Sequence, residues 1–341
     1  MTIQEFQIRQ IPARELYGDF WFNSEPVPIS ALRGRVILLD FWDYTCNSSL
    51  RALPYVKEWY RRYNPYGLIV VGVHTPKFPF GKNPKHVQPS IERLGIEYPV
   101  VMENESMIWS RYNKRTWPTK HLIDKDGFVR CVVAGEGNYG AMEQALQSLL
   151  HTSGVTEELP LLMEPAREAD RTGAVSYRAT PELFAGYLRG SIGNVEGYSP
   201  ESIVEYADPK LYLDGRFYLA GNWLNDRHGL RLQEVSGEGQ IIVSYQGLEV
   251  NAVFNNEGGE EYEIVIRQDD QYLAGENKGD DVQIDAEGRS TVLIAEPKMY
   301  GVVRNKEFGE HTLRLSARSN ACGLYSFTFV SSVIPELISN N

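Results

Sequence analysis

Cysteine is scarce in this sequence: 341 residues contain only three, Cys46, Cys131 and Cys322. They lie far apart, and an odd number cannot all pair within one molecule, so a fold held by a disulfide framework is excluded. The paired CxxC spacing of a zinc ribbon is absent and the six histidines are scattered. We therefore predict that no metal is bound.

Positive charge and long apolar runs are also limited. Acidic residues outnumber basic ones by 45 to 34, a formal net charge of −11, and no Lys/Arg-rich block occurs. A nucleic acid requires a basic face, so we predict no nucleic-acid partner. No stretch approaches the roughly 18 uninterrupted apolar residues of a membrane segment, and residues 1–10 lack the order of a signal peptide. The chain as given is predicted to be cytoplasmic, or periplasmic if a leader or anchor was removed.

The first 150 residues alternate strand and helix signals. Val36–Trp42 is an apolar run broken only by Asp40, which is typical of a buried parallel strand. Apolar residues at helical spacing predict a helix from Ser49 to Tyr63. Further strands are predicted over 68–73, 121–123 and 128–133, and further helices over 89–94, 107–112 and 140–150. This order predicts an α/β domain over residues 1–152.

The pattern of apolar and polar residues changes twice after that domain. Residues 153–199 are punctuated by proline and glycine, and we predict a connector with one short helix over 181–188. From 200 to 335 apolar residues alternate in short runs, which predicts an antiparallel β-sandwich. The predicted strands carry Leu211 and Leu213, Ile241 and Val243, Val250 and Val253, Ile264 and Ile266, Val292 and Ile294, Leu313 and Leu315, and Tyr325 to Phe329.

Cys46 is the strongest candidate for chemistry. It follows the strand that is predicted to end at Trp42, and a helix begins immediately after it. Unpaired N–H groups and the helix dipole favour a thiolate there, and the thiolate is the nucleophile. Because Thr45, Asn47 and Ser48 are polar, we predict an exposed Cys46 whose pKa lies below about 8.5. The alternative is a buried structural cysteine.

The surroundings of Cys46 resemble the thioredoxin-fold family. Asp40 stands six residues before Cys46, where that family has a buried acid, and Pro54 stands eight after it, where a proline kinks the active-site helix. Trp117-Pro118, just before a predicted strand, resembles the family's cis-proline loop. In the family this loop faces the reactive sulfur and pairs with the substrate backbone.

The likeness narrows to thioredoxin-like proteins of the TlpA/DipZ type, in particular the soluble region of DipZ-type proteins. The segments that match are Phe41-Trp42, Thr45-Cys46, Leu53-Pro54-Tyr55-Val56, Gly72-Val73-His74-Thr75-Pro76 and Leu122-Ile123-Asp124. In that group the thioredoxin-like domain precedes a β-sandwich resembling a carbohydrate-binding module. The resemblance implies thiol–disulfide exchange with a protein disulfide or a low-molecular-weight thiol and no cofactor.

The chain departs from the family at Ser49, where the pattern has a second cysteine. A mixed disulfide formed by Cys46 must then be resolved by an external thiol. Three interpretations stay open: a natural monothiol exchanger, a domain that has lost redox turnover and binds a partner, or a substitution that traps a partner. Ser49 either donates a hydrogen bond to the thiolate or fills the space.

Two further residues are site candidates. Asp40, which matches the family's proton relay, is expected to have a pKa raised by burial, and His74 is a weaker candidate.

Aromatic residues are candidates for a glycan site in the sandwich, because a flat ring can stack on a sugar. The candidates are Trp223, Tyr245, Tyr262, Tyr272 and Tyr300. Aromatic residues in strands usually belong to the core, so we expect most of these to be core.

A nucleotide-binding motif is also present in the first domain. Gly135 to Gly140 match GxGxxG, but no strand is predicted after the following helix, so we predict no nucleotide cofactor.

Overall fold

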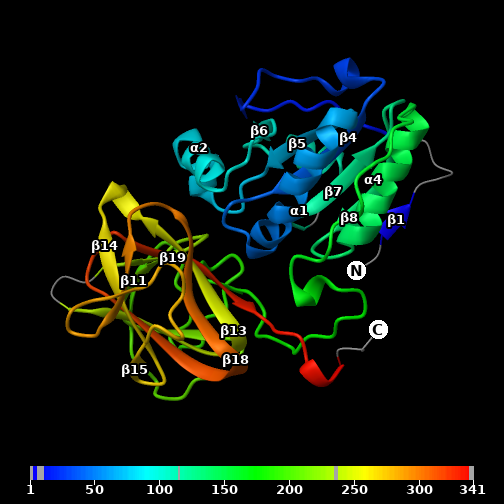
Figure 1. Cartoon of the computed structure of the whole chain (residues 1–341). Helices are drawn as coiled ribbons and strands as arrows, with labels where there is room; N and C mark the ends of the chain where they lie inside the picture. The colour runs from blue at the N-terminus through cyan, green and yellow to red at the C-terminus, as the bar shows by residue number, and fades with distance from the viewer. Residues whose placement is uncertain (1–2, 6–10, 114–115, 234–236, 338–341) are drawn as a thin grey trace. The chain divides into compact units, whose positions relative to one another are not determined.

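The computed structural model describes residues 3–5, 11–113, 116–233 and 237–337. Residues 1–2 and 6–10, which belong to the N-terminal stretch considered as a leader, lie outside the described residues. The chain forms two compact units, Met1–Thr172 and Gly173–Asn341 (Figure 1). The segment 153–199, for which a connector was predicted, is divided between them.

The first unit is an α/β domain built on one mixed sheet. Its strands are β1 (Ile3–Glu5), β2 (Ile11–Pro12), β3 (Phe20–Phe22), β4 (Val36–Trp42), β5 (Leu68–His74), β6 (Val100–Met102), β7 (Thr119–Ile123) and β8 (Phe128–Ala134). Its helices are α1 (Asn47–Tyr63), α2 (Pro84–Arg93), α3 (Met107–Arg111) and α4 (Tyr139–Ser153), with short 3-10 turns η1 (Ile29–Leu32), η2 (Asn64–Tyr66), η3 (Pro79–Lys82) and η4 (Glu168–Asp170). Among the described residues the strand order is β1-β8-β7-β4-β5-β6-β3, and β2 also pairs with β8.

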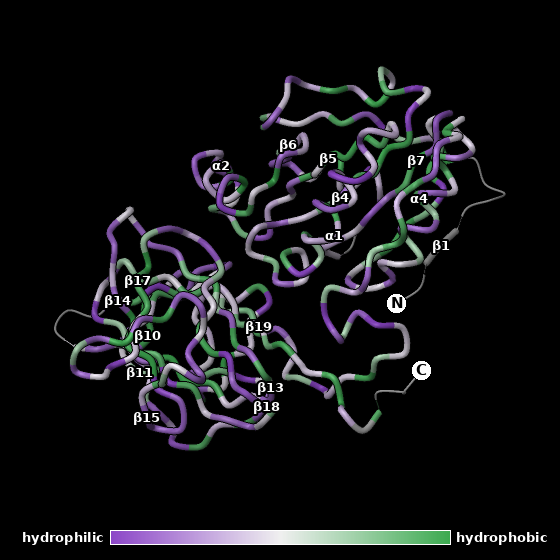
Figure 2. Tube along the Cα trace, viewed as in Figure 1, coloured by the Kyte–Doolittle hydropathy of each residue, from purple (hydrophilic) through white to green (hydrophobic). Residues whose placement is uncertain are grey.

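The centre of this sheet is β4, which is buried along its whole length. It runs parallel to β5 and antiparallel to β7, and β5 runs parallel to β6. Ile37, Leu39 and Phe41 point to the face that carries Ile108 of α3, while α4 contacts the other face. Figure 2 shows hydrophobic residues along these central strands. The predicted apolar strand is therefore confirmed, because helices cover it on both sides.

The helices follow the predicted order, with different boundaries. α1 begins at Asn47, two residues before the predicted start. α2 begins at Pro84, five residues early, because the Asn83 side chain accepts a hydrogen bond from the Lys85 amide and a proline occupies the first helical position. Local capping thus set a boundary that apolar spacing alone did not show.

The second unit is a β-sandwich. Its strands are β9 (Leu183–Phe184), β10 (Ile203–Tyr206), β11 (Phe217–Asn225), β12 (Leu230–Leu232), β13 (Gly239–Asn256), β14 (Tyr262–Gln268), β15 (Gln271–Tyr272), β16 (Gln283–Ile284), β17 (Ser290–Ile294), β18 (Lys298–Ala317) and β19 (Cys322–Val330), with 3-10 turns η5 (Glu257–Gly259) and η6 (Pro335–Leu337). β13 pairs with β11 along its first part and with β19 along its second, and β18 follows its other side. Register shifts between Gly247 and Asn251 mark where the long strand bends over the core.

Two local predictions in this region are wrong. Residues 181–188 contain β9 instead of a helix, because Leu183 and Phe184 pair with β19. Leu211 and Leu213 lie outside the strands and are exposed. Between them the half-buried Tyr212 donates a hydrogen bond from its hydroxyl to Asp208 at 2.7 Å and accepts one from Arg314 of β18 at 3.1 Å.

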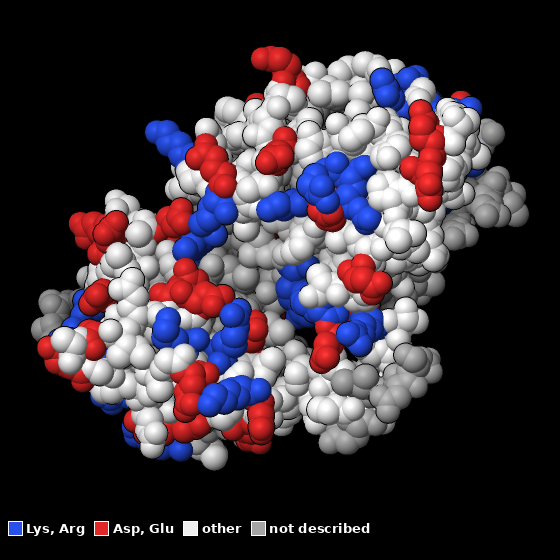
Figure 3. All heavy atoms as spheres, in the orientation of Figure 1, with Lys and Arg blue, Asp and Glu red and all other residues white. Residues whose placement is uncertain are grey.

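No helix of the described residues is long and apolar enough to span a membrane. On the face drawn in Figure 3, acidic and basic side chains are interspersed over both units. That face presents no continuous basic track of the kind that binds a phosphate backbone.

Candidate functional site

The candidate site lies at one edge of the first unit's sheet, where the parallel strands β4, β5 and β6 end. Cys46 follows β4, Thr75 follows β5 and Glu103 follows β6. The antiparallel strand β7 begins at the same edge, since Thr119 pairs with Phe41 near the end of β4. Carboxyl ends of parallel strands are where such sheets place their ligands.

Cys46 is the N-cap residue of α1 and has an extended backbone. Its amide donates a hydrogen bond to the Asp43 carbonyl at 3.1 Å, and its carbonyl accepts one from the Leu50 amide at 3.0 Å. The strand–loop–helix sequence therefore brings this sulfur to the unpaired N–H groups of the first helical turn.

The environment of the thiol differs from the sequence prediction. Cys46 is only 7% exposed, and its thiol donates to the Trp117 carbonyl oxygen, with a Sγ–O distance of 4.0 Å. Burial raises the pKa of Cys46, while the charge of Lys77 and hydrogen bonds from Ser49 lower it. The prediction of an exposed thiol with a lowered pKa is therefore wrong, because the loss of hydration outweighs the groups that favour the thiolate.

Ser49 and the loop before β7 complete the immediate surroundings of Cys46. Ser49 is buried and its hydroxyl also accepts a hydrogen bond from the Asp43 amide at 3.4 Å. The Trp117–Pro118 peptide bond is cis, and the Trp117 indole N–H donates to the Thr75 carbonyl at 3.0 Å. The structure thus brings Ser49 and the Trp117–Pro118 segment to Cys46, and Ser49 lowers the pKa of the thiol by hydrogen bonding.

Asp40 has a different partner. Its carboxylate lies 3.5 Å from the Lys120 ammonium, and both side chains are almost fully buried. Burial raises the pKa of Asp40 and Lys120 lowers it, with burial the larger effect. This is the direction that the sequence predicted. Lys120 itself was missed: it stands immediately before the predicted strand 121–123, whereas β7 begins at Thr119 and includes it.

Sequence reasoning also missed Asp43, which organises the loop between β4 and α1. Its carboxylate accepts hydrogen bonds from the Thr45 amide at 2.7 Å, the Thr45 hydroxyl and the Lys77 amide at 3.0 Å, and it lies 3.4 Å from His74 Nε2. Burial alone would raise the pKa of Asp43, but His74, Thr45 and the Lys77 amide together lower it. His74, the weaker candidate, is therefore the buried partner of a carboxylate. The signal that could have identified Asp43 is its position, since it is a charged residue directly after the buried strand that ends at Trp42.

The other two cysteines lie elsewhere in the fold. Cys131 is buried and its thiol faces Met142 Sδ at 3.8 Å. Cys322 belongs to the second unit, and burial raises its pKa to about 12. None of these three described cysteines forms a disulfide. Cys131 and Cys322 thus both occupy core positions.

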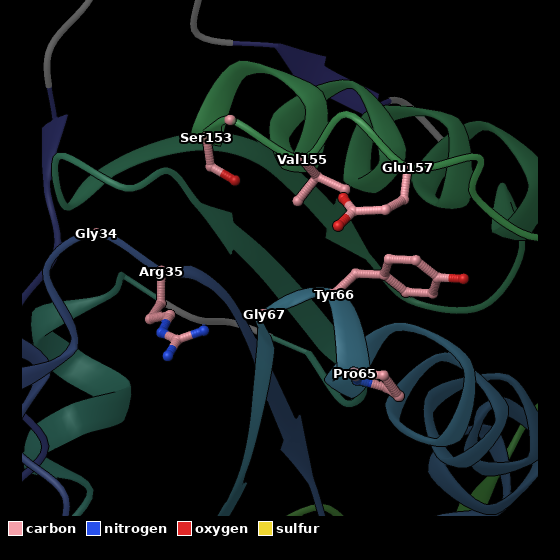
Figure 4. Close-up of a pocket in the computed structure, with 9 residues that line it drawn as sticks. Gly34, Arg35, Pro65, Tyr66, Gly67, Ser153, Val155 and Glu157 are labelled. Atoms are coloured by element: carbon pink, nitrogen blue, oxygen red, sulfur yellow. The ribbon is translucent and has the colours of Figure 1, made fainter.

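A pocket of about 350 Å³ lies at the opposite end of β4 (Figure 4). Gly34 and Arg35, which precede β4, form part of its lining, together with Tyr66 and Glu157. Cys46 follows the other end of β4, and seven residues of strand span roughly 23 Å. The pocket is therefore separate from the thiol site.

Comparisons with known proteins place this architecture in a family. A family model described as "Thioredoxin like C-terminal domain" matches residues 180–329. Protein DipZ of Mycobacterium bovis is 34% identical over 244 residues, which cover 70% of this chain and 34% of DipZ. Thiol-disulfide oxidoreductase ResA of Geobacillus kaustophilus is 30% identical over 121 residues, 36% of this chain and 67% of ResA. A solved thiol-disulfide isomerase from Corynebacterium glutamicum is 22% identical, with a TM-score of 0.37, and the match covers 43% of this chain and 98% of that one.

The chain belongs to the thioredoxin-like family of thiol-disulfide oxidoreductases. Its match to DipZ covers a larger share of the chain than its match to ResA, and it spans about a third of the length of DipZ. The resemblance read from the Cys46 and Trp117-Pro118 segments is confirmed at the level of the family. The cytoplasmic location stays a prediction.

Proposed function

We propose that Cys46 carries out thiol–disulfide exchange by itself, in a CxxS version of the family's site. The Cys46 thiolate attacks one sulfur of a partner disulfide, a new S–S bond forms, and the other sulfur leaves as a thiolate that takes a proton from water. An external thiolate then attacks the partner's sulfur in the mixed disulfide. That step forms a disulfide between partner and external thiol and releases the Cys46 thiolate.

The observation that carries this proposal is the position of the sulfur. Cys46 caps α1 at the carboxyl end of β4 and faces the Trp117 carbonyl at 4.0 Å. Hydrogen bonds from Ser49 and the charge of Lys77 both favour its thiolate. Neither Cys131 nor Cys322 shares this site, so resolution by an external thiol is the step that fits the chain.

Protein disulfides and low-molecular-weight thiols are the partners we propose, in line with the thiol-disulfide chemistry that ResA's name states. Because Cys46 is 7% exposed, a protein disulfide reaches the sulfur only when the residues that cover it move aside. The loop with Trp117 and Pro118 is the segment whose carbonyl lies against the sulfur. We therefore expect small disulfides to react faster than folded protein disulfides.

The second candidate function is binding of a partner without redox turnover. Cys46 is buried, and burial raises the pKa of its thiol. Both properties disfavour a reactive thiolate and so favour this alternative. A glycan has no comparable support as the partner. Four of the five candidate aromatic residues are buried in the sandwich and offer no flat face to a sugar: Trp223, Tyr245, Tyr262 and Tyr300.

The test is to follow adduct formation with oxidised glutathione by intact-protein mass spectrometry. We expect the wild type to gain one glutathione, to lose it when reduced glutathione is added, and to be inert as Cys46→Ser. A Cys131→Ser variant serves as the matched control and should form the adduct like the wild type. Ser49→Cys should add dithiol turnover, measured as reduction of insulin. A wild type that forms no adduct, together with an inactive Ser49→Cys variant, would favour the binding function.

A further inference from the structure

Glu103 is a buried carboxylate to which the exchange step assigns no task. It follows β6 and is only 2% exposed. Its oxygens accept hydrogen bonds from the Thr75 hydroxyl at 2.5 Å, from the Ile108 amide at 2.5 Å and from the Trp109 amide at 2.9 and 3.2 Å. One carboxylate therefore ties the end of β5 to the first turn of α3.

Two of the three residues that donate hydrogen bonds to Glu103, Thr75 and Trp109, also contact Trp117. The Thr75 carbonyl accepts the hydrogen bond from the Trp117 indole at 3.0 Å. The Trp109 ring lies against the Trp117 ring, with centroids 4.3 Å apart and planes inclined by 31°. The indole is thus fixed at its N–H by one residue and at its face by another, and both are anchored on the same carboxylate.

The main chain of Trp117 is the part that meets the sulfur, since its carbonyl lies 4.0 Å from Cys46 Sγ. A displacement of the indole moves this carbonyl and the start of β7 with it. Burial raises the pKa of Glu103, and the hydrogen bonds from Thr75, Ile108 and Trp109 oppose that rise, so these donors favour the carboxylate that holds them together. The hydrogen bonds of Glu103 run to Thr75, Ile108 and Trp109, so its contact with the site passes through the residues that hold Trp117.

We propose that Glu103 is a positioning residue that sets the Trp117–Pro118 segment against Cys46 and thereby governs exchange with peptide disulfides. This inference rests on the proposed exchange function of Cys46. A peptide disulfide lies along the loop as it approaches the sulfur, whereas a small alkylating reagent needs only the thiolate. Loss of the anchor should therefore slow the first reaction and spare the second.

The test uses Glu103→Gln in the full chain, because glutamine keeps the size but turns one acceptor oxygen into a donor that faces backbone N–H groups. Two rates at Cys46 are measured: alkylation by iodoacetamide, and release of thionitrobenzoate from a short peptide activated as a mixed disulfide. We expect the peptide rate to fall roughly tenfold and the alkylation rate to change less than about twofold, as misplacement of a substrate contact predicts. The near-UV circular dichroism of the tryptophans should weaken in parallel.

Three further variants test whether the effect of Glu103→Gln comes from loss of the anchor. Trp109→Phe leaves the carboxylate in place but weakens the ring contact, and should reproduce the selective loss of the peptide rate. Glu103→Asp keeps the charge and should recover part of that rate. Glu105→Gln is the matched control: Glu105 is 76% exposed and pairs with Lys82 at 3.5 Å, so neither rate should change.

The outcomes separate the two proposals. A Glu103→Gln protein that reacts with the peptide like the wild type, or that loses both rates equally, overturns the positioning role. A wild type that alkylates normally but releases no thionitrobenzoate overturns the exchange function instead. In that case the dichroism still tests the anchor: an unchanged tryptophan signal in Glu103→Gln refutes it.

Discussion

At the scale of single residues, the reactivity of Cys46 depends on a balance between burial and a few close groups. Burial is the largest influence and raises the pKa of Cys46, whereas the charge of Lys77 opposes it. Lys77 is itself only 8% exposed. Its charge therefore acts mainly through the protein, in which charges interact more strongly than they do in water. Asp43, whose carboxylate binds the Lys77 amide at 3.0 Å, works against the thiolate.

Replacing Lys77 by methionine should raise the pKa of Cys46 further, because the opposing positive charge is removed while burial remains. The midpoint of iodoacetamide labelling against pH should move upward, and at neutral pH the reaction should slow. Lys77→Arg should keep the midpoint near that of the wild type. Lys85→Met, which alters an exposed lysine of α2, is the control. A midpoint in Lys77→Met equal to that of the control would contradict this account.

At the scale of elements, the site depends on how loops after separate strands are fastened together. Asp43, after β4, binds Lys77 and His74 from the end of β5 and the loop beyond it. Glu103, after β6, binds Thr75 from that same loop and Trp109 from α3. Two buried carboxylates thus join three loops that the order of elements along the chain leaves far apart.

Asp43→Asn should lower the free energy of unfolding at pH 7 by about 2–4 kcal/mol, because the His74 contact and the Lys77 hydrogen bond lose a buried charged acceptor. The pKa of Asp43 is lowered in the folded state, so its stabilisation is complete above the ordinary value of 3.8 and is lost as the pH falls through the folded-state value. The difference between wild type and variant should therefore narrow below pH 3.8.

Urea unfolding followed by tryptophan fluorescence, repeated over a pH series, measures both effects. Asp126→Asn is the matched control, since that aspartate lies exposed at the turn between β7 and β8. A stability difference that stays constant at every pH would show that the Asp43 charge contributes nothing.

At the scale of the whole molecule, the chain beyond α4 remains part of the first unit up to Thr172. The Tyr55 hydroxyl accepts a hydrogen bond from the Ala166 amide at 2.7 Å and donates one to Asp170 at 2.8 Å. The Met163 amide donates to Glu143 of α4 at 2.9 Å. This segment, residues 160–170, therefore closes over α1 and α4 and belongs to the packed unit.

Tyr55→Phe should lower the free energy of unfolding of the first unit by about 1–3 kcal/mol, because the Ala166 amide and the Asp170 carboxylate lose a common partner. Differential scanning calorimetry or urea unfolding checks this, with Tyr60→Phe on the same helix as the control. The Tyr60 hydroxyl makes no hydrogen bond to the described part of the chain. Equal stability of the two variants would show that the 160–170 segment contributes little.

The sequence alone determined the features that depend on local pattern. The apolar run of β4, the helical spacing of α1, the place of Cys46 between them and the order of the later elements all follow from side-chain periodicity and helix-end chemistry. Two segments whose secondary structure was predicted wrongly, residues 181–188 and the run around Leu211, have conformations that are set by pairing or contact with distant strands.

Only the tertiary structure decided how the site works. Exposure of Cys46 depends on the loop with Trp117, which is 71 residues away in the sequence. The contacts of Asp43 with His74 and of Glu103 with Thr75 likewise join segments whose pairing no local pattern encodes. Burial is a property of packing, and it is burial that turns a cysteine at the start of a helix into one whose pKa is raised.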